Sequence, residues 1–135
     1  MKKLIYVVKG LVEHNGRFLL LKKAKDIIPE NISKWECSGG RIKKDEDPAK
    51  ALLREIKEET GLDCNIERTL PPVYMETKDI YNLCHVFLVK APSKKVKLSE
   101  EHSDFRWVKP NEVKNMHLVL FADLLLNYFE MLEKQ

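Results

Sequence analysis

Three glutamate residues stand close together in the segment GGRIKKDEDPAKALLREIKEETGL, residues 39 to 62. Glu55, Glu58 and Glu59 are three and four positions apart, so on an α-helix their side chains would project from neighbouring points of one side. Like charges at this spacing repel one another, and the repulsion disappears if a divalent cation lies among the carboxylates. The alternative is a solvated helix on which Arg54 and Glu58 form an ordinary ion pair.

A cluster of carboxylates has the chemistry that Mg²⁺ requires. Mg²⁺ takes hard oxygen ligands, keeps several of its waters, and is commonly shared between a few carboxylates and the phosphates of a substrate. Mn²⁺ accepts the same ligands. The three glutamates therefore predict a site for Mg²⁺ or Mn²⁺ that faces a phosphorylated small molecule.

The helix that must carry these glutamates has clear start and stop signals. Asp47 is a suitable N-cap, Pro48 suits the first helical position, and Gly61 suits the left-handed residue that ends a helix. We therefore predict a helix from about Pro48 to Thr60. Its apolar stripe toward the core would consist of Ala49, Leu52, Leu53 and Ile56.

The rest of the chain predicts a mixed β-sheet with helices packed on it. Asn15 and Gly16 suit a tight hairpin between two β-rich runs. A short run over residues 35–38 and three later runs are rich in β-branched and aromatic residues, with Pro71-Pro72 as an interruption. The later strands are expected within residues 63–79, 80–92 and 104–108, with a further edge at 93–98 and a closing amphipathic helix over 117–135.

Composition and charge limit the class of protein. The 135 residues, of which 44% are hydrophobic and 33% charged, predict one globular domain over residues 1–135. The formal net charge of +3 is compatible with phosphate-bearing ligands and makes nucleic acid an unlikely partner. No apolar run is long enough to span a bilayer, so no membrane partner is expected.

The cysteines predict the compartment. Cys37, Cys64 and Cys84 are odd in number and widely spaced, which argues against a disulfide framework or a zinc site. A reduced, cytoplasmic setting is therefore expected.

The charged segment resembles the Nudix box at every fixed position. The matching residues are Gly40, five residues, Glu46, seven residues, Arg54-Glu55, apolar Ile56, one residue, Glu58-Glu59, one residue, Gly61 and apolar Leu62. The segments GRFLLLKKA, KWECSGG and SEEHSDFRWVKPNEV also look like the framework of small Nudix hydrolases. Two positions depart from the common pattern. Cys37-Ser38 stands where many members have Leu-Pro, and Asp45 replaces a frequent glycine.

The resemblance implies a fold, a reaction and residue roles. The fold would be the Nudix α/β/α sandwich with a mixed β-sheet, and the reaction would be attack of water on a phosphorus of a nucleoside diphosphate linked to another moiety. Metal ligands would be Glu55, Glu58, Glu59 and the carbonyl of Gly40. Arg54 would hold the carboxylate of Glu55 or Glu46 in position, and Glu46 would act at the loop end of the site. The general base would be Glu55 or Glu101, with Glu100 as a weaker candidate. His102 would be a surface or hydrogen-bonding histidine.

The substrate remains open at the level of the sequence. Nucleoside triphosphates or modified nucleotides are the leading class of substrate for such a small chain. The protein would act as a monomer or homodimer. The alternatives are another diphosphate, such as ADP-ribose, a dinucleoside polyphosphate or an RNA 5′ end, or a non-catalytic nucleotide-binding or RNA-binding Nudix module. Candidate substrate contacts are Tyr6, Tyr74, Phe87 and Asp123.

Overall fold

The structure is a computed structural model and describes residues 1–119, 122–123 and 125–134. Its strands are β1 (Lys3–His14), β2 (Arg17–Lys23), β3 (Trp35–Glu36), β4 (Ser38–Arg41), β5 (Asn65–Glu76), β6 (Ile80–Lys90) and β7 (His102–Val108). Its helices are α1 (Pro48–Thr60) and α3 (Leu126–Glu133), with short 3₁₀ helices η1 (Pro29–Asn31) and η2 (Pro110–Asn115). No helix among these residues is long and apolar enough to cross a membrane.

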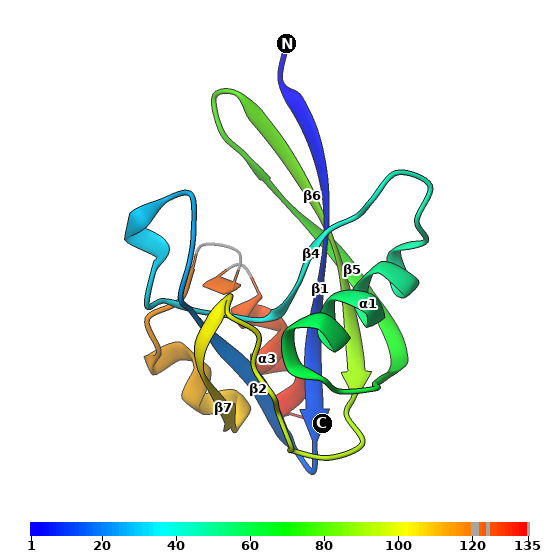
Figure 1. Ribbon diagram of the computed structural model, residues 1–135, viewed down its shortest axis with the longest axis vertical. Coiled ribbons are helices and arrows are strands. Elements are labelled where there is room, and N and C mark those ends of the chain that lie inside the picture. Colours follow the sequence, from blue (N-terminus) through cyan, green and yellow to red (C-terminus); the bar gives the residue numbers. More distant parts are fainter. Residues whose placement is uncertain (120–121, 124, 135) are drawn as a thin grey trace.

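Within this described part of the chain, seven strands form one mixed sheet (Figure 1). Strand β1 is central: it runs parallel to β6 and antiparallel to both β2 and β4. The main strand order is β3-β2-β1-β6-β5, while β4 pairs with β1 and β7 pairs with β2. Asn15 and Gly16 connect β1 to β2 with φ angles of 51° and 81°, as the hairpin prediction required.

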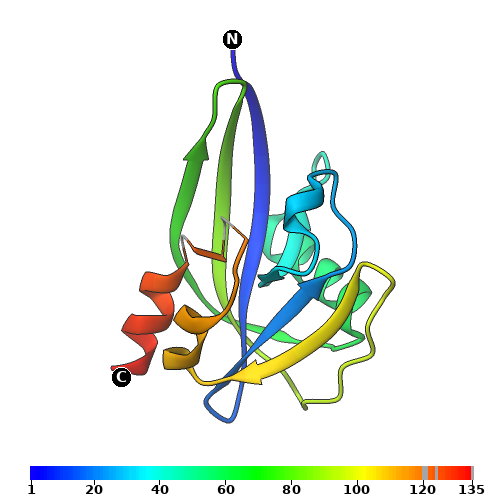
Figure 2. The ribbon, with the colours of Figure 1, turned by 90° about the vertical axis from the view of Figure 1, so that its left-hand side faces the viewer.

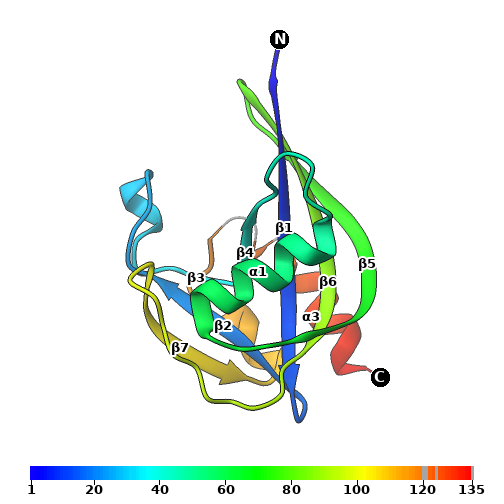
Figure 3. The ribbon, with the colours of Figure 1, turned by 45° about the vertical axis from the view of Figure 1, so that its right-hand side comes forward.

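Helical elements cover both faces of the sheet, which confirms the predicted α/β/α sandwich. Helix α1 crosses one face, where Leu52 and Ile56 are fully buried against Val8 of β1 (Figure 3). The 3₁₀ helix η2 and helix α3 lie on the opposite face, where Phe129 packs against Leu11 (Figure 2). The sheet therefore separates two apolar cores.

Helix α1 has the predicted bounds. The Asp47 carboxylate accepts a hydrogen bond of 3.1 Å from the backbone amide of Lys50, and Gly61 ends the helix with φ at 75°. The apolar stripe differs by one residue from the prediction: Ala51 is fully buried, whereas Leu53 is only half-buried. The stripe is therefore rotated toward the side of the helix that also carries Glu59.

The predicted closing helix over 117–135 is wrong at its beginning. Leu118 forms a parallel bridge with Trp35, and the Val119 amide donates to the Trp35 carbonyl at 3.0 Å. The apolar residues there pack in extended conformation against the sheet, because a buried extended segment satisfies the same apolar pattern. Helix α3 begins only at Leu126; positions 120, 121, 124 and 135 of the prediction lie outside the described residues.

Two strand predictions also need correction. Strand β5 continues through Pro71-Pro72, with a register shift between Leu70 and Val73. Proline is tolerated there because β5 is an edge strand of the sheet, and the irregularity removes the need for a ladder hydrogen bond. Residues 93–98, expected to extend an edge, form no strand in the described structure.

The left-handed backbone of Asp45 generates a stability prediction. Its φ of 63° is costly for most residues, and glycine adopts this conformation without a Cβ penalty. Asp45→Gly should raise the free energy of unfolding by up to about 1 kcal/mol, whereas Asp45→Ala should lower it. Urea denaturation of the three proteins at one pH measures both changes. An Asp45→Ala protein as stable as Asp45→Gly would contradict the argument.

Candidate metal and catalytic site

The site lies where β4 packs between β1 and α1. A Cβ atom on Gly39 would lie 2.0 Å from the Val8 carbonyl oxygen, and one on Gly40 would lie 2.8 Å from the carboxyl carbon of Glu55. Both contacts are closer than van der Waals packing allows, so a side chain at Gly39 would require a shift of the backbone, and one at Gly40 would require the Glu55 carboxylate to move. The close approach brings the backbone of Gly40 directly against a side chain of α1.

Arg54 holds three carboxylates together at the exposed side of α1. Its Nε and Nη2 atoms donate to the two oxygens of Glu46 at 2.7 and 3.0 Å, which is a bidentate pair. Its Nη1 atom donates to Glu55 Oε1 at 3.0 Å and to Glu58 Oε1 at 3.2 Å. The repulsion expected between the glutamates is therefore partly offset by one guanidinium group.

The carboxylates around Arg54 have different proton affinities. The hydrogen bonds from Arg54, with one from the Lys43 amide, lower the pKa of Glu46 to about 2. Glu55 is half-buried, and burial raises its pKa despite the hydrogen bond from Arg54; the nearby carboxylates of Glu58 and Glu101 act in the same direction as burial. Glu46 is thus a fixed carboxylate, whereas Glu55 has the higher proton affinity that a base needs.

Glu59 points inward and is only 4% exposed. Its Oε1 atom accepts hydrogen bonds from the Ser38 hydroxyl at 2.5 Å and from the Gly39 amide at 3.1 Å. Burial raises the pKa of Glu59 to about 7, although Lys9 and Ser38 act in the opposite direction. The three glutamates therefore differ in environment: Glu58 is exposed, Glu55 is half-buried, and Glu59 faces β4.

A buried charged network lies next to Glu59 and was not anticipated from the sequence. Lys9 donates to Glu36 Oε1 at 3.1 Å and to the Cys37 carbonyl at 3.0 Å. The other oxygen of Glu36 lies 2.7 Å from His102 Nε2 and 3.4 Å from Lys23 Nζ. The sequence feature that predicts this network is a lysine in the middle of the apolar run of β1, since a charged residue there requires a buried partner.

The network fixes the charges of its members. Burial alone would lower the pKa of Lys9 and raise that of Glu36, but their attraction outweighs burial and shifts both pKa values the opposite way. Lys9 is therefore a cation and Glu36 a carboxylate. Cys37, in contact with this network and 1% exposed, has its pKa raised to about 12 by burial, as expected for a packed thiol.

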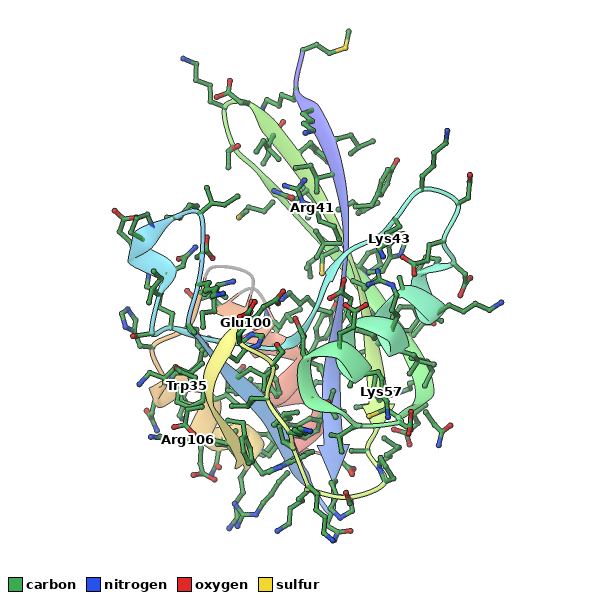
Figure 4. The ribbon with its side chains drawn as sticks, in the orientation of Figure 1. Trp35, Arg41, Lys43, Lys57, Glu100 and Arg106 are labelled. Atoms are coloured by element: carbon green, nitrogen blue, oxygen red, sulfur yellow. The ribbon has the colours of Figure 1, made fainter. Side chains whose placement is uncertain are left out.

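Glu101 and His102 complete the site from the start of β7. One carboxylate oxygen each from Glu59 and Glu101 and one ring nitrogen of His102 all lie within 4.8 Å of one another. His102 is hydrogen-bonded, as predicted, but it is buried and not on the surface. Glu100 lies at the turn before β7 (Figure 4), where it is 83% exposed and pairs with Lys25, so Glu101 is the acidic residue of this loop that faces the site.

The predicted substrate contacts do not share a pocket. Phe87 is 6% exposed and belongs to the core beneath α1. Tyr6 and Tyr74 are exposed on the part of the sheet that extends past α1, and Tyr74 stacks on Tyr81 at 5.4 Å. Asp123 is exposed in the segment before α3, and its backbone amide donates to the Val119 carbonyl at 3.0 Å. The role of these residues in substrate binding stays a prediction.

Two adjoining clefts open beside the charged network, and Lys23, Asp26 and Glu36 line both. One cleft, of about 410 Å³, reaches Glu101 and His102. The other, of about 430 Å³, also has apolar side chains in its wall: Ile28, Met75 and Val119. A third cleft, of about 460 Å³, lies between η2 and α3 and shares no lining residue with these two.

The donor set fits a divalent cation. The carboxylates of Glu59 and Glu101 supply hard oxygen atoms, and the Ser38 hydroxyl and Gly39 amide orient Glu59 in the way that outer hydrogen bonds orient metal ligands. On the same helix, Glu58 is exposed to solvent and the Glu55 carboxylate lies against Gly40. Lys43 follows in the loop from β4 to α1 (Figure 4), where a lysine could contact a bound phosphate.

Comparison with known proteins places this geometry in a family context. The sequence model of the NUDIX domain family matches residues 4–128. The chain is 29% identical over 120 residues to the nucleoside triphosphatase NudI of Escherichia coli, covering 79% of this chain and 83% of the relative. The crystal structure of the MutT protein from Methanosarcina mazei Go1 has a TM-score of 0.81 at 27% identity, covering 98% of this chain and 95% of that one. The NUDIX domain of Shewanella oneidensis NrtR, crystallised with ADP ribose, has a TM-score of 0.78 at 18% identity, covering 97% and 89% of the two chains; this likeness shows the fold alone.

The pairing of Glu46 with Arg54 predicts a pH effect on stability. The pKa of Glu46 is about 2 in the folded protein, against an ordinary value of 4.5, so the pair stabilises the fold above pH 4.5 and this contribution is lost as the pH falls toward 2. Glu46→Gln should therefore be less stable than wild type at pH 6, and the gap should narrow at pH 3. Urea denaturation at both pH values measures it, with the exposed Glu133→Gln as control. A gap that is unchanged at pH 3 would contradict the prediction.

Proposed function

Because this chain belongs to the Nudix hydrolase family, we propose that it hydrolyses nucleoside triphosphates with Mg²⁺ or Mn²⁺ as cofactor. Hydrolysis of a pyrophosphate bond is the activity of the family. The nucleoside triphosphate substrate and the metal ion are what we propose for this chain. The observation that carries it is the position of Glu101, which lies beside Glu59 and lines a cleft together with Lys23 and Lys25. Carboxylates for a metal and lysines for phosphates meet at one place.

The two adjoining clefts support a nucleotide as the substrate. The cleft with Lys23, Lys25 and Glu101 suits a phosphate chain that binds together with a divalent cation, because Lys23 already pairs with Asp26 and Glu36, and Lys25 pairs with Glu100. The cleft with Ile28, Met75 and Val119 suits a base or sugar, since small-molecule sites combine apolar walls with a few polar groups. A nucleoside triphosphatase among the relatives favours this substrate class.

The proposed roles follow the box and the geometry together. Glu58 and Glu59 would hold the metal together with Glu101 and the Gly40 carbonyl. The bound metal would lower the pKa of the attacking water and neutralise charge on the phosphates. Glu55 would take the proton from the water that attacks phosphorus, because burial raises the pKa of this carboxyl. Arg54, braced by Glu46, would orient Glu55.

The free cysteines and the net charge bear on the cellular setting and the class of substrate. Cys37, Cys64 and Cys84 are free thiols in the described structure, which supports a reducing compartment such as the cytoplasm. The mild net charge supports a small-molecule substrate over nucleic acid. The chain would act as a monomer or homodimer.

The second candidate function is hydrolysis of another diphosphate or binding without catalysis. A relative with the same fold was crystallised with ADP ribose, so the fold accommodates nucleotides of more than one shape. Against a purely binding module, the box keeps Glu55, Glu58 and Glu59. A dinucleoside polyphosphate or an RNA 5′ end presents the same pyrophosphate linkage and belongs in the same test.

A nucleotide panel tests substrate and metal together. Release of phosphate or pyrophosphate should be measured from nucleoside triphosphates, ADP-ribose, a dinucleoside polyphosphate and 5′-triphosphorylated RNA. EDTA should abolish hydrolysis, and Mg²⁺ or Mn²⁺ should restore it, because the carboxylate ligands suit both ions. Full activity in EDTA would contradict the metal role. Turnover of ADP-ribose with no turnover of triphosphates would favour the second candidate.

Paired variants test the role of the base. Glu55→Gln should lower kcat by about 10² to 10⁴, the usual worth of general base catalysis, while the Mg²⁺ concentration for half-maximal rate changes little. Glu101→Gln should instead raise the Mg²⁺ requirement, with kcat recovering at high metal. Both quantities come from initial rates across a Mg²⁺ titration. The reverse pattern would assign the base to Glu101.

A further inference from the structure

His102 has one nitrogen committed and one nitrogen free. Its side chain is 2% exposed, and Nε2 lies 2.7 Å from Glu36 Oε2. Nδ1 is buried and has no hydrogen-bond partner within the described part of the chain. Leaving a buried polar atom unpaired is costly, so this nitrogen requires an explanation.

The partner of Nε2 fixes which nitrogen of the neutral ring carries the proton. Glu36 is a carboxylate because Lys9 and Lys23 lie beside it, so it accepts a hydrogen bond from the Nε2 hydrogen. In the neutral imidazole, the proton then resides on Nε2 and Nδ1 carries a lone pair. Histidines that bind metals almost always donate their other N–H to a carboxylate in this way. Glu36 thus holds His102 as an outer carboxylate holds a metal-binding imidazole.

The surroundings of the ring supply the other ligands. A ring nitrogen of His102 and one oxygen each of Glu59 and Glu101 lie within 4.8 Å of one another. Ligand atoms about 2.1 to 2.2 Å from a cation are separated from each other by up to roughly 4.4 Å. Because Nε2 is bound to Glu36, Nδ1 is the nitrogen left to bind an ion, and a small rotation of the exposed Glu101 side chain would bring the three residues within this separation of one another.

We propose that His102 Nδ1 is a metal ligand that, with Glu59 and Glu101, makes a mixed nitrogen and oxygen site favouring Mn²⁺ or Co²⁺ over Mg²⁺. This inference rests on the proposed function only in placing a divalent cation at Glu59. It adds a ligand outside the box. Mg²⁺ prefers oxygen atoms alone, whereas an imidazole nitrogen raises affinity for first-row transition metals, modestly for Mn²⁺ and more for Co²⁺. The ion preference of this chain would then be set by His102.

A competing arrangement gives the opposite spectroscopic result. If His102 were an imidazolium, both nitrogens would donate, and the ring would pair with Glu36 on one side and with the carboxylates of Glu59 and Glu101 on the other. No nitrogen would then coordinate the ion. Pulsed electron paramagnetic resonance of Mn²⁺ distinguishes the two, because a coordinated imidazole nitrogen couples to the Mn²⁺ electron spins.

The test uses the full-length protein with Mn²⁺ alone, without nucleotide. The wild type should show ¹⁴N coupling that changes when histidine is labelled with ¹⁵N. His102→Gln should lose the coupling and bind Mn²⁺ about tenfold or more weakly by titration calorimetry, while its Mg²⁺ affinity stays within about threefold. His117→Gln is the matched control, because His117 is exposed and contributes only its backbone carbonyl to the Trp35 amide; it should retain both signals.

The wild-type spectrum decides the proposal even if His102→Gln fails to fold. Mn²⁺ bound without nitrogen coupling, or coupling that survives in folded His102→Gln, overturns the assignment of His102, as does the absence of Mn²⁺ binding. Hydrolysis of nucleoside triphosphates by wild-type protein with Mg²⁺ is measured separately. If the wild type does not hydrolyse nucleoside triphosphates, the proposed function is contradicted. If it does hydrolyse them but shows no nitrogen coupling, only the role of His102 is contradicted.

Discussion

The close approach of strand β4 to both β1 and α1 is the constraint on which the site depends. Gly39 and Gly40 have no side chains, so the backbone of β4 can pass between the Val8 carbonyl and the Glu55 carboxyl. This contact lets Glu59 reach the Gly39 amide and the Ser38 hydroxyl. A side chain at Gly39 would clash with the Val8 backbone of β1, and a side chain at Gly40 would displace the Glu55 carboxylate.

The second constraint is the compensation of buried charge. Lys9, Glu36 and His102 are each less than 10% exposed, and a lone charge in that position would be strongly destabilising. Their mutual hydrogen bonds make the burial tolerable and also lock the ring of His102. A network that serves the stability of the fold thus also determines which atoms of the site stay available to a ligand.

The outer and inner carboxylates are held by different means, which suits different tasks. Arg54 binds Glu46, Glu55 and Glu58 from the solvent side, where the ion pairs can rearrange when a metal or phosphate arrives. Glu59 is fixed from the protein side by β4 and is nearly inaccessible. In the proposed function, Glu59 would be a rigid ligand for the cation, and the carboxylates of Glu55 and Glu58 would adjust when substrate binds.

The sequence alone determined the features that depend on neighbouring residues. Asp47, Pro48 and Gly61 specify both ends of α1, and Asn15-Gly16 specifies the first hairpin, because caps and tight turns are decided within a few residues. The spacing of the box likewise identifies the family, since every fixed position lies in one continuous segment.

Only the tertiary structure decided how residues distant in the chain meet. It turned Glu59 inward, buried His102 against Glu36 across 66 positions, and placed Phe87 in the core instead of near a substrate. It also made Leu118 a bridge partner of Trp35 where a helix was expected. These outcomes depend on strand register and on which face of the sheet each helix covers. A short segment of sequence does not specify which distant residue will pack against its apolar or charged side chains.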